Sequence, residues 1–227
     1  MGFPQFITKM GGNALATENF ITRIKNTLFS NQQQTIEEET TMMKIGIISG
    51  SVREGNNAAA VSQWILDFAN NRNDEGVEYE LVSLADYDLP LLGAKLPIER
   101  QEAAGAAIQA WSEKIASFDG YVFVTPEYNH AVGGALKNAI DFLKPEVANK
   151  AAALVGYGSL GGARAHENLR VILGELSVAT VRTTTNFSLM TDFENMSVFK
   201  PNDYNKVNAE GMFNDLLLWT KGLHTIR

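Results

Sequence analysis

Short apolar runs rich in β-branched residues alternate with helical patterns along most of this 227-residue chain. The runs predict strands at residues 44–49, 77–83, 120–125, 151–157 and 178–183. Between the runs, apolar residues recur at three- and four-residue spacing, which predicts amphipathic helices. Alternating strands and helices are typical of a parallel sheet with helices on both faces. We therefore predict a doubly wound, three-layer α/β/α domain with five parallel strands.

The order of the strands can be predicted from the two most distinctive loops, which follow the first and the third strand. In the order 2-1-3-4-5 the topology switches direction between those two strands, and open α/β sheets bind ligands at such a switch, outside the carboxyl ends of the strands. We predict this order. The predicted helices have apolar stripes at residues 61–68, 108–118, 136–143, 169–176 and about 208–223.

Composition excludes several classes of function. With 19 basic and 26 acidic residues the chain has a net charge of −7, which disfavours binding to nucleic acid or to an anionic membrane. It has no cysteine, so disulfides, thiolate metal sites and thiol catalysis are excluded, and redox chemistry would need a cofactor. We predict no metal site. No apolar stretch reaches the ~18 to 20 residues of a membrane span, so we expect a soluble, cytoplasmic protein.

Residues 1–43 differ in composition from the rest of the chain, being rich in Asn, Gln and Thr. Such a composition is typical of a disordered tail, although a targeting presequence is a second interpretation. Met42 and Met43 directly precede the first strand, and we hypothesise that one of them is the start of translation. We thus expect a disordered or untranslated extension at 1–43 and one folded domain at 44–227. Native protein with residues upstream of Met42 would contradict the untranslated alternative.

Residues 50–57, the first edge segment, follow the first strand and lead into a helix. Glycines permit a tight turn, while Ser51, Asn56 and Asn57 supply short polar side chains next to a helix N-terminus, which favours an anion. Arg53 adds a cationic donor. Because the GxGxxG spacing of dinucleotide sites is absent, a mononucleotide phosphate is the favoured ligand. The alternative is that an asparagine only caps the helix and that Arg53 is a solvated turn residue.

Residues 125–130, the second edge segment, follow the third strand with the sequence TPEYNH. Fixed backbone N–H and C=O groups beside an aromatic ring suit a flat, polar-edged heterocycle such as a flavin, with Tyr128 as its neighbour. For Glu127 we favour a structural role, with the carboxylate hydrogen-bonded to its own loop or to a partner subunit. His130 is better explained as a surface or packing residue than as a proton donor.

Residues 156–162, the third edge segment, follow the fourth strand and again combine glycines with the start of a helix. Backbone N–H groups at that start, aided by the helix dipole, would stabilise negative charge on a reduced flavin ring. The alternative is an ordinary turn between a strand and a helix.

Together, the sequences GSVREGNN at 50–57, TPEYNHAVGGALKNAIDFL at 125–143 and GYGSLGGARAHENLR at 156–170 resemble the NADPH-dependent FMN reductase family. This family includes quinone, azo-dye and chromate reductases of flavodoxin-like fold. The resemblance covers about residues 43–227. The PEYN motif with the downstream GALKNAIDFL is its most specific part.

The resemblance implies which residues contact the cofactor. In the family the first edge segment holds the FMN phosphate, and the other two contact the isoalloxazine ring. Asn56 is included in the predicted site, although many relatives have Ser or Arg there. The predicted FMN contacts are Ser51, Arg53, Asn56 and Asn57 in the first segment, Pro126, Glu127, Tyr128 and Asn129 in the second, and Ser159, Gly161 and Gly162 in the third.

The resemblance also implies a ping-pong reaction. NADPH or NADH transfers hydride to N5 of bound FMN and leaves, and a quinone or similar small acceptor then takes two electrons, so no catalytic side chain is predicted. Family members are typically homodimers or homotetramers, which we expect here. Three alternatives stay open: a flavodoxin-like electron carrier, an FMN reductase that releases reduced flavin to a partner monooxygenase, and a noncatalytic sensor of flavin redox state.

Overall fold

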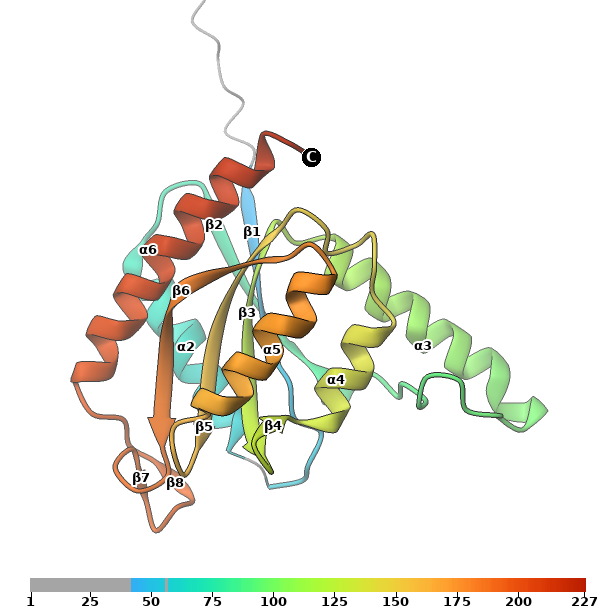
Figure 1. Cartoon of the computed structure of the whole chain (residues 1–227), viewed down its shortest axis with the longest axis horizontal. Coiled ribbons are helices and arrows are strands. Elements are labelled where there is room, and N and C mark those ends of the chain that lie inside the picture. Colours follow the sequence, from blue (N-terminus) through green and yellow to red (C-terminus); the bar gives the residue numbers. More distant parts are fainter. Residues whose placement is uncertain (1–41, 56) are drawn as a thin grey trace, which may run out of the picture. The chain divides into compact units, whose positions relative to one another are not determined.

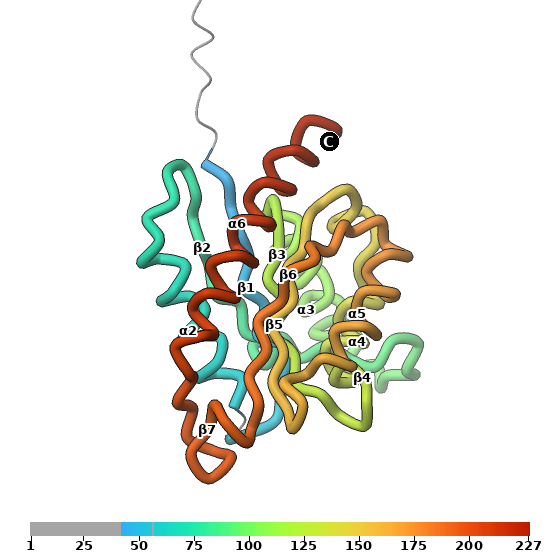
Figure 2. Tube along the Cα trace, turned by 60° about the vertical axis from the view of Figure 1, so that its left-hand side comes forward, coloured from blue at the N-terminus to red at the C-terminus, as the bar shows by residue number. Residues whose placement is uncertain are grey.

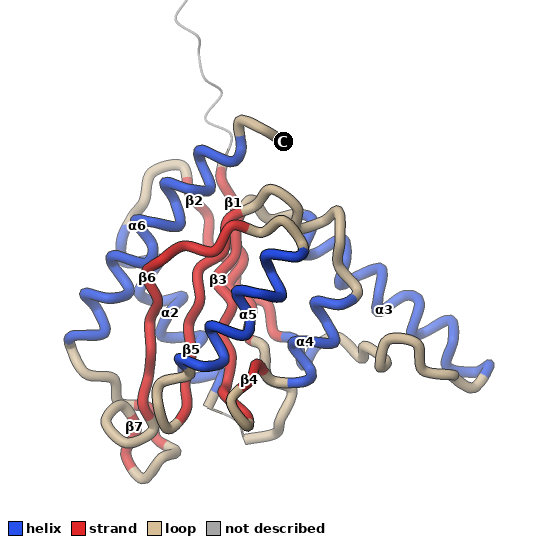
Figure 3. The backbone as a smooth tube through the Cα atoms, viewed as in Figure 1, coloured by secondary structure: helices blue, strands red, loops and turns tan. Residues whose placement is uncertain are grey.

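The structure is a computed structural model that describes residues 42–55 and 57–227. Of the predicted extension at 1–43, only Met42 and Met43 are among the described residues. Asn56 of the first edge segment also lies outside them. The rest of the chain forms three layers, with a central sheet between two groups of helices (Figures 1 and 3).

The central sheet has five parallel strands in the order β2-β1-β3-β5-β6, which is the predicted order 2-1-3-4-5 for strands counted along the chain. Two further pairings are antiparallel: β4 pairs with β3, and β7 pairs with β8 in a separate hairpin. The strands are β1 (Met43–Ser49), β2 (Val77–Ser83), β3 (Gly120–Tyr128), β4 (Ala131–Val132), β5 (Ala151–Gly158), β6 (Ala179–Ser188), β7 (Phe193–Glu194) and β8 (Val198–Phe199).

Helices cover both faces of the sheet, as Figure 2 shows from a second direction. On one face lie α2 (Ala58–Arg72) and α6 (Tyr204–His224). On the other lie α3 (Ile98–Ala116), α4 (Gly134–Asp141) and α5 (Ala163–Glu175); a short 3-10 turn, η1 (Leu84–Asp86), follows β2. Among these helices of the described residues, none has the length and apolar character needed to cross a bilayer.

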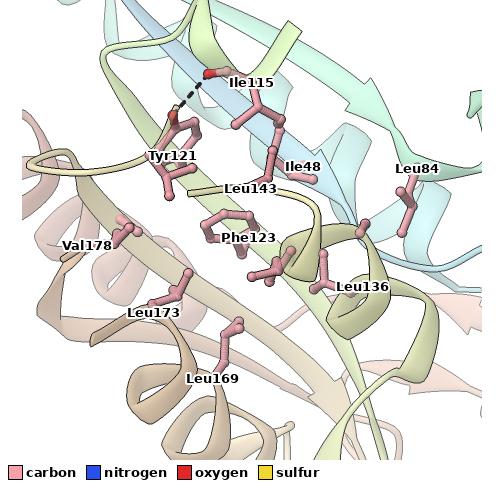
Figure 4. Packing of buried hydrophobic residues seen from close by; sticks show 14 of the residues in the cluster. Ile48, Leu84, Ile115, Tyr121, Phe123, Leu136, Leu143, Leu169, Leu173 and Val178 are labelled. Atoms are coloured by element: carbon pink, nitrogen blue, oxygen red, sulfur yellow. Dashed lines mark hydrogen bonds between the residues drawn. The ribbon is translucent and has the colours of Figure 1, made fainter. Parts of the chain in front are cut away.

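The sheet is buried on both faces because alternate residues of its strands enter two hydrophobic cores. On β3, Tyr121 and Phe123 pack with α3, α4 and α5, while Val122 and Val124 pack with α2 and α6. Figure 4 shows Phe123 between Leu136 of α4 and the α5 side chains of the first core. This period of two, with apolar residues on both sides, explains why the strand reads as a continuous apolar run in the sequence.

The second edge segment differs from the prediction, because most of it is strand rather than loop. β3 continues through Tyr128, and only Asn129 and His130 form the turn to β4. Both turn residues have positive φ angles, 49° and 68°, as type I′ hairpin turns require, and Asn is well suited to such angles. The extension of β3 carries Glu127 and Tyr128 beyond the carboxyl edge of the sheet.

Candidate functional site

The three edge segments lie together at the carboxyl edge of the sheet, at the bottom of Figure 1. The first begins at Gly50, whose N–H donates to the Val124 carbonyl at 2.9 Å. A Cβ atom at Gly50 would lie 2.6 Å from the Leu136 side chain, so only glycine fits between β3 and α4. Next to it Ser51 is buried, and its Oγ accepts the Arg53 N–H at 3.4 Å. The Arg53 side chain is exposed.

Asn57 occupies the N-cap position of α2, where the sequence predicted a helix start. Its side chain makes no capping hydrogen bond to α2. Instead, Nδ2 donates to the carbonyl of Met196 at 3.2 Å, in the β7–β8 hairpin. The hairpin is therefore tied to the end of the first edge segment, a contact between residues far apart in sequence.

The backbone of the second edge segment offers a free strand edge. Pairing between β3 and β5 ends at Pro126 and Tyr157, while Glu127 and Tyr128 pair only with β4 on the other side. The backbone edge of Glu127 that faces the third edge segment thus has no strand partner in the described part of the chain. Gly158 of β5 lies close to this edge, since a Cβ atom there would be 3.8 Å from the Glu127 N. Tyr128 is 41% exposed. A polar-edged ring would find hydrogen-bonding groups along such an edge.

The Glu127 carboxylate binds the first turn of α5. It accepts the backbone N–H groups of Arg164 at 3.0 Å and Ala165 at 3.4 Å and forms an ion pair with the Arg164 guanidinium. Burial alone would raise the pKa of this carboxyl, but these donors outweigh burial and lower the pKa below its ordinary value. The carboxylate is thus hydrogen-bonded as expected, although to α5 rather than to its own loop.

This contact corrects the interpretation of the third edge segment. The N–H groups of Arg164 and Ala165 point to Glu127, which neutralises the positive end of the α5 dipole. That helix start is therefore not free to stabilise charge on a reduced ring. The Arg164 guanidinium also lies 2.7 Å from Nε2 of His130, so Glu127 and His130 of the second edge segment both contact the first turn of α5.

Glycines let the third edge segment fold back on β5. Gly161 and Gly162 have φ angles of 67° and 80°, in the left-handed region that other residues rarely adopt. A Cβ atom at Gly162 would lie 2.7 Å from the Gly156 Cα, closer than any real contact of this kind. Ser159 is exposed, and its carbonyl accepts the Ser188 hydroxyl at 3.1 Å. The sequence predicted this turn and its glycines.

Tyr157, which the sequence did not single out, lies where the segments meet. The residue is 5% exposed, and its hydroxyl has no hydrogen-bond partner among the described residues. With the buried Ser51 and the free edge of β3, this hydroxyl supplies polar groups of the kinds that a phosphate and a flat heterocycle require. The residues present therefore fit FMN.

A cleft of about 480 Å³ opens beside the first edge segment, which contributes Val52 to its wall. The carboxylate of Asp88 is the single charged group among its lining residues, so no cationic side chain is present there to bind a phosphate. The side chain of Asn138 shapes it by accepting the Leu92 N–H and donating to the Pro90 carbonyl. The lining residues are Val52, Leu84, Ala85, Tyr87, Asp88, Leu89, Leu91, Gly134, Ala135 and Asn138.

Comparison with known proteins gives relatives for most of the chain. Residues 43–192 match the NADPH-dependent FMN reductase family. The NAD(P)H-dependent FMN reductase ntnL of Nectria sp is 35% identical over 160 residues, which are 66% of this chain and 79% of that protein. The quinone reductase of Escherichia coli K12 is 35% identical over 137 residues, covering 58% of this chain and 69% of that protein.

Among solved structures, the flavoenzyme NAD(P)H:(acceptor) oxidoreductase FerB of Paracoccus denitrificans superposes with a TM-score of 0.60. The two chains are 19% identical, and the alignment covers 79% of this chain and 98% of FerB. At this identity the similarity describes the fold alone.

Proposed function

Since the chain belongs to the NADPH-dependent FMN reductase family, we propose that it is an FMN-dependent oxidoreductase that transfers two electrons from NAD(P)H to a quinone or a similar small acceptor. The observation that carries this proposal is that the family match, residues 43–192, spans all three edge segments. These segments also meet at the edge of the sheet where α/β proteins bind nucleotides.

The proposed FMN site uses all three edge segments. When bound, FMN would supply the hydride chemistry, by accepting hydride from NAD(P)H and passing two electrons on. The proposed phosphate contacts are Ser51, Arg53, Asn56 and Asn57, and the proposed ring contacts are Pro126, Glu127, Tyr128, Asn129, Ser159, Gly161 and Gly162. For Glu127 the proposed contact is through the backbone, because its carboxylate is bound to α5.

In this proposal the protein positions the ring and does not react with it. The Glu127–Arg164 ion pair holds the free edge of β3 beside the third edge segment, which keeps backbone N–H and C=O groups at fixed positions. Fixed groups of this kind lose little freedom when a ligand binds. The exposed Tyr128 ring is suited to cover one part of the cofactor.

Turnover of NADPH with a water-soluble benzoquinone tests the proposal. Full-length protein supplied with FMN should oxidise one NADPH for each quinone reduced, at a rate above that of free FMN. Bound flavin without NADPH oxidation would instead favour an electron carrier or a sensor. Activity that persists only while FMN is supplied in excess and released reduced would favour the flavin-releasing alternative.

Replacing Arg53 with alanine should weaken FMN binding by about 1.5 to 3 kcal/mol, the usual contribution of a hydrogen bond to a charged group. Affinity can be measured by quenching of flavin fluorescence. Riboflavin, which lacks the phosphate, should bind both proteins equally. Arg182→Ala removes an exposed arginine of β6 and serves as the control. Unchanged FMN affinity in the Arg53 variant would remove this residue from the site.

We also propose a homodimer or homotetramer and a cytoplasmic location. The segment that leads into α3 supports self-association, since Leu91 is 73% and Ile98 84% exposed and the first turns of α3 extend away from the sheet (Figure 1). Analytical ultracentrifugation of the wild type and of the double variant Leu91→Asp, Ile98→Asp should give an oligomer and a smaller species, respectively. A wild-type monomer at micromolar concentration would contradict the proposed assembly.

A further inference from the structure

The hydroxyl of Tyr157 is a buried polar group without a partner. The side chain comes from the carboxyl end of β5 and belongs to the hydrophobic core that also contains residues of α2 and α6. The hydroxyl itself is inaccessible to solvent and forms no hydrogen bond within residues 42–55 and 57–227. Native proteins contain few such groups, because a buried donor without an acceptor is destabilising.

Tyr121 shows how the same side chain is normally accommodated in this fold. It is fully buried, and its hydroxyl proton is shared between the Ile115 carbonyl at 3.0 Å (dashed line in Figure 4) and the Glu146 carbonyl at 3.2 Å. A tyrosine hydroxyl can thus be buried in this fold and still have acceptors, so burial does not explain why the Tyr157 hydroxyl has none among the described residues.

The groups around the Tyr157 hydroxyl belong to the proposed cofactor site. Burial raises the pKa of the hydroxyl most, and Tyr128 raises it further, whereas Ser51 and Arg53 lower it. These three neighbours come from the first and second edge segments. Ser51 interacts with the hydroxyl but does not form a hydrogen bond of normal geometry with it. The hydroxyl is thus next to the segment proposed to hold the phosphate.

We infer that the Tyr157 hydroxyl donates a hydrogen bond to the phosphate of FMN. This inference rests on the proposed function and adds a binding residue to it. A phosphate has only acceptor oxygens to offer, and a neutral tyrosine hydroxyl has one proton to donate, so the two are complementary. The ring stays in the core, and the ligand satisfies a donor that the protein leaves unpaired. A further consequence is that both Tyr157 and Arg53 should favour FMN over riboflavin, which lacks the phosphate.

Tyr157→Phe tests the inference, because it removes the hydroxyl and keeps the ring. Dissociation constants for FMN and riboflavin are measured on the full-length chain freed of flavin, together with its melting temperature. We expect the FMN constant to rise about tenfold or more, the size of a lost hydrogen bond to a charged group. The riboflavin constant should not change, and the flavin-free variant should melt at the same or a higher temperature.

Tyr121→Phe is the matched control, since it removes a buried hydroxyl that has partners. It should lower the melting temperature and leave both dissociation constants unchanged. For Tyr157→Phe, equal weakening of FMN and riboflavin, or unchanged FMN affinity, would overturn the inference alone. A wild-type chain that binds no FMN would overturn the proposed function as well, so the two failures are distinguishable.

Discussion

Replacing Glu127 with alanine is expected to lower the free energy of unfolding by about 2 to 4 kcal/mol and to weaken FMN binding more than tenfold. The Glu127 side chain is only 4% exposed and accepts the N–H groups of Arg164 and Ala165, so its removal leaves the start of α5 without an acceptor. It also leaves the Arg164 guanidinium without its counter-ion. Denaturant unfolding of the flavin-free chain and an FMN titration measure the two effects.

Glu127→Gln separates the charge from the shape. The carboxyl has a lowered pKa in the folded state, so its stabilising effect is fully present above the ordinary value of 4.5 and is lost as the pH falls through the folded value. The stability difference between the wild type and Glu127→Gln should therefore be constant near neutral pH and shrink in acid. An alanine variant as stable as the wild type would show that the contact with α5 is dispensable.

Replacing Asp192 with alanine is expected to lower the free energy of unfolding by about 3 to 5 kcal/mol, since several donors, one of them the buried Asn205 side chain, lose their acceptor at once. The fully buried carboxylate accepts the backbone N–H groups of Ser188 at 2.9 Å and Asn202 at 3.0 Å, and the Asn205 side chain at 2.7 Å. These bonds fix both ends of the segment that contains the β7–β8 hairpin.

Loss of the Asp192 hydrogen bonds should also affect the proposed cofactor site, because Asn57 donates a hydrogen bond to the Met196 carbonyl of the hairpin. Limited proteolysis should cut the Asp192→Ala variant between residues 189 and 203 much faster than the wild type. Asp203→Ala is the control, since that carboxylate at the start of α6 is 93% exposed and pairs only with Lys206 among the described residues, so both measurements should change far less. Equal behaviour of the two variants would contradict the anchoring role of Asp192.

Much of the fold could be predicted because the central strands β1, β3 and β5 are buried on both faces and the helices bury one face each. In the sequence, β3 is a continuous apolar run, and α2 and α5 are apolar stripes at helical spacing. These patterns predict the type of each element, and the positions of the loops predict the strand order. The end of β3 was not predicted. Polar residues and a proline at 125–128 are typical of a loop, but pairing with β4 and with β5 keeps them in a strand.

Contacts within the site were harder to predict, because they join residues far apart in the chain. Glu127 and Arg164 are separated by 37 positions, and Asn57 and Met196 by 139. A pattern in the sequence indicates the side of an element on which a residue lies, not the partner it finds there. Tyr157 was missed for the same reason, since an aromatic residue at the end of an apolar strand is typical of a core.

An anaerobic absorption titration with NADPH, on full-length protein loaded with FMN, tests most directly whether the three edge segments form an FMN-dependent NAD(P)H oxidoreductase. We expect near-stoichiometric FMN to copurify or bind, and its oxidised bands to bleach on addition of one equivalent of NADPH and return when a quinone is added. The function would be contradicted if the protein neither carries nor binds FMN. It would also be contradicted if the bound FMN stays oxidised after NADPH or NADH is added.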